Sequence, residues 1–165
     1  AKQTIEFCNY GCLYNWAVAM NLPLAANEKF QYKSDTTIRG ICPEGWHIPS
    51  NNEVMIMEKL LETYSDFEKK DERRHTGDVG KKLKTASGWY QKGNGTNESG
   101  LSINPSGMRY QDGYFTKAGQ YGYFWTSTEA YDGSAYYRYM VYNSDGTYIG
   151  YPSKKIGMPV RCIKD

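Results

Sequence analysis

Four cysteines, at positions 8, 12, 42 and 162, are the residues with the most distinctive chemistry in this sequence. An even number of cysteines in a polar, aromatic-rich chain permits two disulfides, which form in oxidising compartments, but also permits reduced thiols in a core. Three residues separate Cys8 from Cys12, yet no second closely spaced Cys or His pair completes a tetrahedral zinc site, and His47 and His75 are solitary. We therefore predict no metal site, and the disulfide and thiol alternatives stay open at this point.

Other reactive side chains lack the partners that catalysis requires. Ser127 and Thr128 have no His at a motif-like spacing that could activate a hydroxyl. His47 lies in the string GWHIP before an expected helix, where Pro49 favours a rigid connector, and His75 lies in a charged segment where we expect it to be inert. We predict that the chain is not an enzyme and binds no cofactor. One alternative is a glycoside-cleaving carboxylate pair, whose separation the sequence does not give, drawn from Glu98, Glu129, Asp132 and Asp145.

Residues 131–153 have the composition of a binding surface. Of these 23 residues, 17 are Tyr, Ser, Asp, Asn, Gly or Thr, seven of them are Tyr, and none is Lys or Glu. Tyr combines rigid contact area with a polar tip, and short polar side chains add adaptable hydrogen bonds, as in antibody loops and interface hot spots. The residues that we predict to bind a ligand are Tyr131, Asp132, Ser134, Tyr136, Tyr139, Tyr142, Asn143, Asp145, Tyr148 and Tyr151.

The exposed face of this segment is left undetermined by strand alternation. Positions 135, 137, 139 and 141 share one face of an expected strand and positions 136, 138, 140 and 142 the other, and both faces contain Tyr. The predicted site residues therefore come from both faces. The expected ligand is a protein or a glycan of unknown identity. Residues 93–99 offer several oxygens but not the alternating acidic ligands of an EF-hand, so we expect a stabilising loop there.

The elements that position these residues follow an order of helix first and strands later. Ser50 and Glu53 form a capping-box pattern, so we predict one main helix over residues 50–64, with an apolar stripe facing the core. We expect a shorter helix at residues 79–85 and antiparallel strands at residues 122–127, 135–142, 147–151 and 158–163, with a hairpin turn at 143–146. This order predicts an α+β fold. The stripe consists of Val54, Met57, Leu60, Leu61 and Tyr64.

Length and charge exclude several classes of protein. The 165 residues contain no internal repeat, so we predict a single domain over residues 1–165. A net charge of +2 suggests neither a nucleic-acid partner nor an anionic membrane. No apolar stretch is long enough to span a bilayer, so we predict no membrane insertion by this chain, and its first residues lack the order of a signal peptide.

Several short strings together resemble the Fibrobacter succinogenes major paralogous domain, a family of exported bacterial domains found chiefly in Bacteroidetes. They cover nearly the whole chain and leave residues 65–78 as an apparent charged insertion. The strings are YG (10–11) with LYNW (13–16), GICPEGWHIPS (40–50), KLK (82–84) with SGW (87–89), GTNESG (95–100), FWTSTE (124–129) and VRC (160–162). Similar helix-entry and closing-strand strings occur in formylglycine-generating-enzyme-like domains, which have a C-type lectin-like fold.

This resemblance implies a secreted or cell-surface domain with a C-type lectin-like fold that acts as an adhesin or receptor. It also implies a disulfide between Cys42 and Cys162, the family's recurrent cysteines, which would leave Cys8 and Cys12 to each other. The binding segment could further be the hypervariable part of a diversity-generating retroelement protein. The enzyme alternative that it implies is formylglycine-generating-like chemistry at Cys162, which would require a second reactive thiol nearby.

Overall fold

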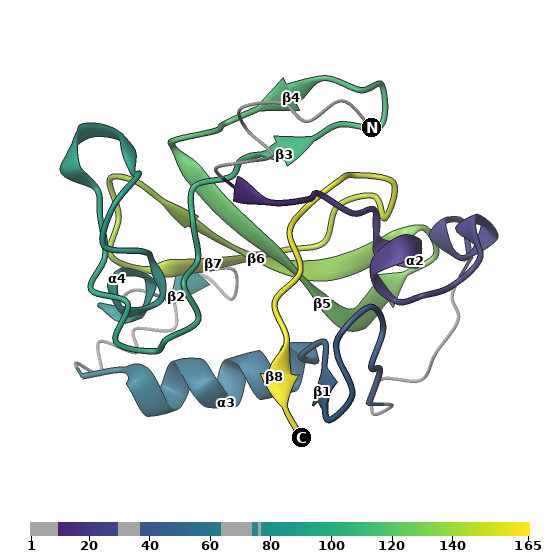
Figure 1. Ribbon diagram of the computed structural model, residues 1–165, viewed down its shortest axis with the longest axis horizontal. Helices are drawn as coiled ribbons and strands as arrows, with labels where there is room; N and C mark the ends of the chain where they lie inside the picture. The colour runs from purple at the N-terminus through teal and green to yellow at the C-terminus, as the bar shows by residue number, and fades with distance from the viewer. Residues whose placement is uncertain (1–9, 30–36, 64–73, 76) are drawn as a thin grey trace.

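A sheet of four antiparallel strands, in the order β2-β7-β6-β5, organises the computed structural model (Figure 1). The structure describes residues 10–29, 37–63, 74–75 and 77–165. The strands of this sheet are β2 (Arg74–His75), β5 (Tyr121–Tyr131), β6 (Ser134–Val141) and β7 (Thr147–Gly150). Two small sheets pair β1 (Trp46–His47) with β8 (Ile163–Lys164), and β3 (Met108–Arg109) with β4 (Phe115–Thr116).

The helical segments among the described residues lie mostly before the long strands. They are α2 (Trp16–Ala19), η1 (Leu24–Asn27), α3 (Asn51–Leu61), α4 (Val79–Leu83) and η2 (Tyr90–Lys92). This mixture of helices and antiparallel sheet confirms the predicted α+β class. Each of these described helices is too short or too polar to cross a lipid bilayer.

The main helix, α3, begins as the sequence predicts. The Ser50 hydroxyl accepts a hydrogen bond from the Glu53 amide, and the Glu53 carboxylate accepts one from the Ser50 amide, so both capping-box contacts form. The Thr128 hydroxyl accepts a further hydrogen bond from the Asn51 amide, which attaches the start of the helix to the end of the sheet. The described helix ends at Leu61, because Glu62 is already extended.

The predicted apolar stripe of α3 is wrong at one position. Leu60 is 81% exposed, whereas Val54 is buried and Met57 and Leu61 pack against the core. The fourth core-facing position is Glu58, which is 2% exposed. A charged residue can take that position because it meets a buried Arg from the sheet, a contact that no periodicity of apolar residues can reveal. Tyr64 lies outside the described residues.

The sheet separates two apolar cores. Helices α3 and α4 cover one face, and the core there is formed by Val54, Val79, Leu83, Trp89, Ile103, Phe124 and Met140. The opposite face carries Tyr123 and Trp125 and packs against α2 and the segment near residue 158. In Figure 1, α3 runs along the lower side of the sheet and the β3–β4 hairpin lies above it. Residues that alternate along β5 and β6 therefore enter two different environments.

The outer edge of β5 is occupied by loop segments. The Trp125 amide donates to the Pro159 carbonyl, the Ser127 amide donates to the Pro49 carbonyl, and the Tyr121 carbonyl accepts from the Gly107 amide. These bonds lie on the side of β5 opposite β6, which is the strand that pairs with β5 among the described residues. The longest strand thus has backbone partners on both sides.

The disulfide between Cys42 and Cys162 is confirmed. The two Cα atoms lie 5.9 Å apart, and the bond joins residues that are 120 positions apart in the sequence. Cys42 belongs to the core on the tyrosine-bearing face, and Cys162 packs against that core. Cys12 is exposed and carries a free thiol. The predicted pairing of Cys12 with Cys8 is therefore not borne out, and Cys8 itself lies outside the described residues.

Two strand assignments differ from the prediction. The expected strand at residues 158–163 is reduced to β8 at its end, while Met158 forms only an isolated bridge with Tyr14. This segment must also supply backbone groups to β5 and β3, so its hydrogen bonds go to several partners instead of one ladder. Within the charged insertion, residues 74–75 form β2 and pair with β7, although the sequence favoured a solvated excursion there.

Candidate ligand-binding face

Three of the predicted tyrosines meet at the end of the sheet beside the β5–β6 turn, and we call them the end cluster: Tyr131, Tyr136 and Tyr151. The Tyr131 and Tyr151 ring centroids lie 5.6 Å apart at 68°, and those of Tyr136 and Tyr151 lie 5.9 Å apart at 78°. Edge-to-face pairs of this kind are favoured by the charge distribution of aromatic rings. Tyr131 is 55% exposed and Tyr151 is 39% exposed, so the cluster presents aromatic surface to solvent.

Local backbone geometry brings the end cluster together. Tyr131 pairs with Ser134 across a tight turn whose Gly133 has a φ of +72°, a conformation that glycine adopts without strain. An isolated bridge between Ser134 and Ser153 and a hydrogen bond from the Lys154 amide to the Gly133 carbonyl hold the next segment against this turn. Tyr151 is thereby placed beside Tyr131. The predicted site residues Asp132 and Ser134 lie in the same turn, Asp132 exposed and Ser134 half-buried.

The buried ammonium group of Lys154 stabilises the turn between β5 and β6. The Lys154 side chain is fully buried, and its Nζ donates to the carbonyls of Ala26 and Lys29 and to the Glu129 carboxylate. The same Nζ lies 4.5 Å from the centroid of the Trp16 ring. A buried charge is stable only when it is paired and hydrogen-bonded, and these contacts meet that requirement. The buried, hydrogen-bonded Lys154 therefore stabilises the β5–β6 turn.

A second buried ion pair joins the sheet to α3. Arg138 Nε lies 3.0 Å from Glu58 Oε1, and both side chains are almost completely shielded from solvent. Arg138 Nη1 also donates to the side-chain oxygen of Asn51 at 2.7 Å, at the first turn of the helix. Arg138 lies between Tyr136 and Tyr139 along β6. The ion pair with Glu58 therefore holds in place the strand that carries both tyrosines.

The opposite face of the sheet carries a second group, which we call the tyrosine ladder: Tyr121, Tyr123, Tyr137, Tyr139 and Tyr148. Neighbouring ring centroids lie between 4.9 Å (Tyr139 to Tyr148) and 6.3 Å (Tyr121 to Tyr139) apart. Register explains the arrangement, because Tyr123 pairs with Tyr139 and Tyr139 with Tyr148 across adjacent strands. Tyr123 is 4% exposed and the other four are half-buried.

The phenol groups of the ladder influence one another's ionisation. Burial is the main reason that the pKa of Tyr123 is raised far above the usual value, and the phenols of Tyr137, Tyr121, Tyr110 and Tyr139 raise it further. The pKa of Tyr137 is raised by burial and by the phenols of Tyr139 and Tyr110. The Tyr123 and Tyr137 hydroxyls are therefore neutral at physiological pH, and Tyr110, which lies just after β3, reaches the same neighbourhood.

The remaining predicted residues lie at the β6–β7 turn, next to α4. Tyr142 forms an edge-to-face pair with Tyr90, centroids 5.3 Å apart, and packs against the core on the helical side. Asn143 and Asp145 are exposed in the turn, and the Asp145 carbonyl accepts a hydrogen bond from the Lys81 amide. This turn is also held by the buried Lys84, whose Nζ donates to the carbonyls of Val141 and Ser144. Tyr142 thus has a packing role.

The ten predicted residues therefore occupy three places. The end cluster and its turn hold Tyr131, Asp132, Ser134, Tyr136 and Tyr151; the ladder holds Tyr139 and Tyr148; and the β6–β7 turn holds Tyr142, Asn143 and Asp145. The ladder residues that sequence reasoning missed are Tyr121, Tyr123 and Tyr137. Tyr137 had a usable signal, because it alternates with Tyr139, whereas Tyr121 and Tyr123 precede the Tyr-rich segment and are joined to it only by strand pairing.

His47 is held between two carboxylates. Its Nδ1 lies 2.6 Å from Asp165 Oδ1, and its Nε2 lies 2.9 Å from Glu53 Oε1. Burial alone lowers the pKa of His47, but the hydrogen bonds to Asp165 and Glu53 outweigh it and the net shift is upward. Burial likewise raises the pKa of Glu53, whereas hydrogen bonds from Ser50 and from His47 give a net lowering. Since a neutral imidazole donates only one hydrogen bond, this geometry fits the charged imidazolium.

Two of the candidate catalytic groups, Cys162 and Glu129, are engaged in structural contacts. The Cys162 sulfur is bonded to Cys42, and Glu129 pairs with buried Lys154. Among the described residues, no group of three or more His, Cys, Asp or Glu side chains is arranged to hold a metal ion. The loop at 93–99 is tied to α4, since the Thr96 amide donates to the Lys81 carbonyl and the Ser99 amide to the Lys82 carbonyl.

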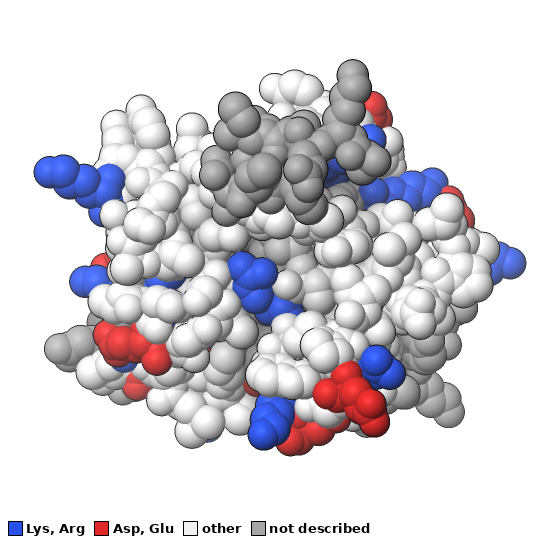
Figure 2. Space-filling model, viewed as in Figure 1, with Lys and Arg blue, Asp and Glu red and all other residues white. Residues whose placement is uncertain are grey.

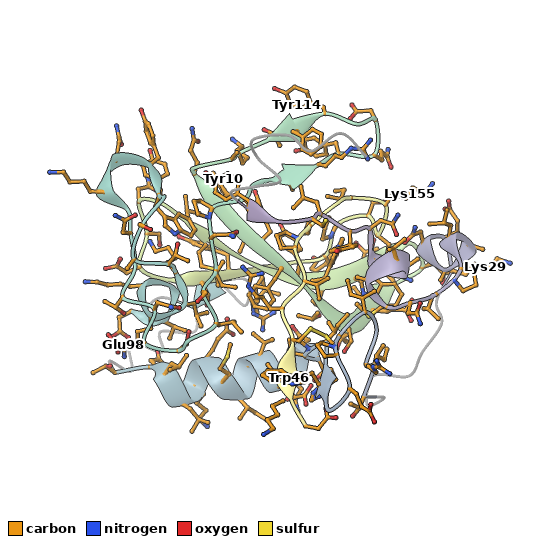
Figure 3. The ribbon with its side chains drawn as sticks, viewed as in Figure 1. Tyr10, Lys29, Trp46, Glu98, Tyr114 and Lys155 are labelled. Atoms are coloured by element: carbon orange, nitrogen blue, oxygen red, sulfur yellow. A yellow bond between two sulfur atoms is a disulfide. The ribbon has the colours of Figure 1, made fainter. Side chains whose placement is uncertain are left out.

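Charge is sparse on the face of the molecule shown in Figure 2, where Lys, Arg, Asp and Glu are scattered and most of the surface is uncharged. Figure 3 places Tyr114 on the β3–β4 hairpin, away from α3.

In comparisons with known proteins, the model of the Fibrobacter succinogenes major domain matches residues 2–164. No curated protein and no solved structure matches the chain.

Proposed function

Since the chain belongs to the Fibrobacter succinogenes major domain family, we propose that it is a non-catalytic ligand-binding domain of a secreted or cell-surface protein, with an adhesin-like or receptor-like role. The end cluster and its turn are the proposed binding face. The ligand is a protein or a glycan. The observation that carries this proposal is that three tyrosines, two of them well exposed, meet at a turn that the buried, hydrogen-bonded Lys154 stabilises.

The chemistry of the end cluster resembles that of binding hot spots. Exposed Tyr131 and Tyr151 supply aromatic contact area, while Asp132 and Ser134 supply short polar groups beside them. Such aromatic anchors contribute most when their positions are fixed before binding, because less side-chain freedom is then lost. The edge-to-face ring contacts and the hydrogen bonds of the buried Lys154 ammonium fix these positions.

A non-catalytic role is supported by what the reactive groups do. Formylglycine-generating-like chemistry would need Cys162 as a thiolate, but its sulfur is in a disulfide. A glycoside-cleaving pair that used Glu129 would need that carboxylate free of its buried partner, Lys154. The disulfide also supports export, since such bonds persist in oxidising compartments.

The proposed architecture is C-type lectin-like, on the basis of the sequence resemblance and of the arrangement of one main helix beside an antiparallel sheet. Within this proposal the Tyr-rich segment can be the hypervariable part of a diversity-generating retroelement protein. A neighbouring reverse transcriptase gene, together with a near-copy of the coding segment that differs only at adenines, is the expected genomic signature. A genome without both elements would remove the hypervariable version and leave the binding proposal intact.

The proposal is tested by screening the immobilised domain against glycan and protein arrays and then measuring hits by surface plasmon resonance. Tyr131→Ala and Tyr151→Ala are each expected to weaken binding by more than about tenfold, as hot-spot truncations do. The matched control is Tyr114→Ala, because Tyr114 is 65% exposed and lies on the β3–β4 hairpin. Unchanged affinity in both end-cluster variants would locate the site elsewhere, and equal loss in the control would show a nonspecific effect.

A further inference from the structure

Two hydroxyls of the tyrosine ladder, those of Tyr123 and Tyr137, have no hydrogen-bond partner among the described residues. Neither hydroxyl makes a hydrogen bond with the rest of the described chain, and burial and neighbouring phenols account for the raised pKa of both groups. The unpaired side-chain atoms that are fully enclosed within the described residues are Asn104 Oδ1, Arg138 Nη2 and Thr147 Oγ1. The Tyr123 and Tyr137 hydroxyls are absent from that group, so each keeps at least a small solvent-accessible area.

This state is unusual for a buried tyrosine. The Tyr123 ring is 4% exposed, and a tyrosine buried to this extent normally hydrogen-bonds its hydroxyl within the protein. Tyr148, a ladder neighbour, does so, since its hydroxyl lies 3.0 Å from the Ser144 hydroxyl. The rings of Tyr123 and Tyr137 are instead in tilted contact, with centroids 5.8 Å apart at 41°, while their hydroxyls make no hydrogen bond to the described residues. Positioned but unpaired polar groups in an apolar setting are what orients a small ligand in a binding site.

We propose that the ladder face, centred on Tyr123 and Tyr137, is a carbohydrate-binding site distinct from the end cluster. A sugar ring matches both properties of this face: its C–H groups pack on aromatic rings, and its hydroxyls exchange hydrogen bonds with phenols that donate and accept. The phenols are neutral, because burial and mutual repulsion of their ionised forms oppose deprotonation. They therefore serve as both donors and acceptors, as a sugar hydroxyl requires.

A neutral sugar fits better than a charged one. Two described cations beside the β3–β4 hairpin lie over aromatic rings: Lys117 Nζ is 5.2 Å from the Tyr121 ring centroid, and the Arg109 guanidinium carbon is 5.7 Å from that of Phe115. Both side chains belong to exposed residues beside the hairpin. The two central hydroxyls carry no charge of their own, so recognition at the centre rests on hydrogen bonds and ring contacts.

The test is isothermal titration calorimetry of the purified domain with neutral gluco-, xylo-, manno- and galacto-oligosaccharides, and with an oligogalacturonate as the charged arm. Tyr123→Phe and Tyr137→Phe keep the rings and remove the hydroxyls, so each is expected to weaken binding of a neutral sugar about fivefold to tenfold. Thermal unfolding of each variant verifies that packing is retained. Tyr131→Phe, which removes an end-cluster hydroxyl, is expected to change this affinity by less than about twofold.

Three results would overturn the proposal. The first is that no neutral oligosaccharide of the panel binds. The second is that the folded Tyr123→Phe and Tyr137→Phe variants bind as the unmodified domain does. The third is that only the oligogalacturonate binds and Lys117→Gln abolishes that binding, which would assign recognition to charge. Because the end cluster is tested by Tyr131→Ala and Tyr151→Ala, a failure of either site leaves the other one standing.

Discussion

Removing the Cys42–Cys162 disulfide is expected to destabilise the domain by about 5 kcal/mol. The bond closes a loop of 120 residues, and loop-closure entropy for a loop of this length corresponds to about 5 kcal/mol at room temperature. Small domains are stable by only about 5–15 kcal/mol, so this one covalent bond would account for a large share of the total. Since Cys42 is buried in a core, reduction leaves two packed thiols, and the loss arises mainly in the unfolded chain.

The measurement is urea unfolding, followed by tryptophan fluorescence, with and without a thiol reductant, and thiol titration verifies that the bond is open. With a urea m value of about 2 kcal/mol/M, the midpoint is expected to fall by on the order of 2 M. Cys12→Ser is the control, because it removes the exposed free thiol and should show the same fall on reduction. A midpoint shift under about 0.5 M, with the bond verified as reduced, would refute the loop-entropy reasoning.

Three further predictions concern packing and charge. Leu83→Ala, at a fully buried position, is expected to lower the free energy of unfolding by about 2–5 kcal/mol, whereas Leu60→Ala, at an 81% exposed one, should change it by under about 0.5 kcal/mol; equal losses in denaturant unfolding would contradict the assigned core. Arg138→Met should cost about 3–5 kcal/mol by removing the guanidinium that pairs with buried Glu58, and Glu58→Leu in the same chain should restore most of that loss; no recovery in the double variant would show that the charge itself is required. Because the pKa of His47 is raised, its stabilising contribution is complete below pH 6.5 and is lost as the pH rises through that raised pKa. His47→Gln should therefore flatten the dependence of the unfolding midpoint on pH. A curve identical to that of the unmodified domain would contradict the imidazolium assignment.

Local signals in the sequence are enough to predict several elements. The capping box at Ser50 and Glu53 forms as expected, because both of its contacts involve residues three positions apart. The hairpin turn at residues 143–146 lies between β6 and β7, as its turn-forming residues indicate. Such features depend on residues that are close in the sequence, so a single sequence is enough to predict them.

Long-range pairing is what the sequence could not supply. The exposed position of Leu60 and the buried position of Glu58 follow from Arg138, 80 residues away from Glu58. For the same reason the Tyr-rich segment could not be divided into faces: Tyr121 and Tyr123 join Tyr137 and Tyr139 only through the β5–β6 register. The composition predicted a binding surface, whereas the register decides which tyrosines lie together.

The occupied edge of β5 has a consequence for solubility and for mutational risk. The stretch YGYFWTS within β5 is aromatic, uncharged and free of Pro, a composition that promotes fibril-like association between chains when a strand edge is bare. The loop carbonyls of Pro49 and Pro159 accept hydrogen bonds from the outward amides of Ser127 and Trp125, and the Gly107 amide donates to the Tyr121 carbonyl. We expect these contacts to hinder self-association along this edge. Variants that loosen these loops should therefore aggregate before they lose helix α3, which makes the loops, and not the tyrosines, the sensitive points for engineering this domain.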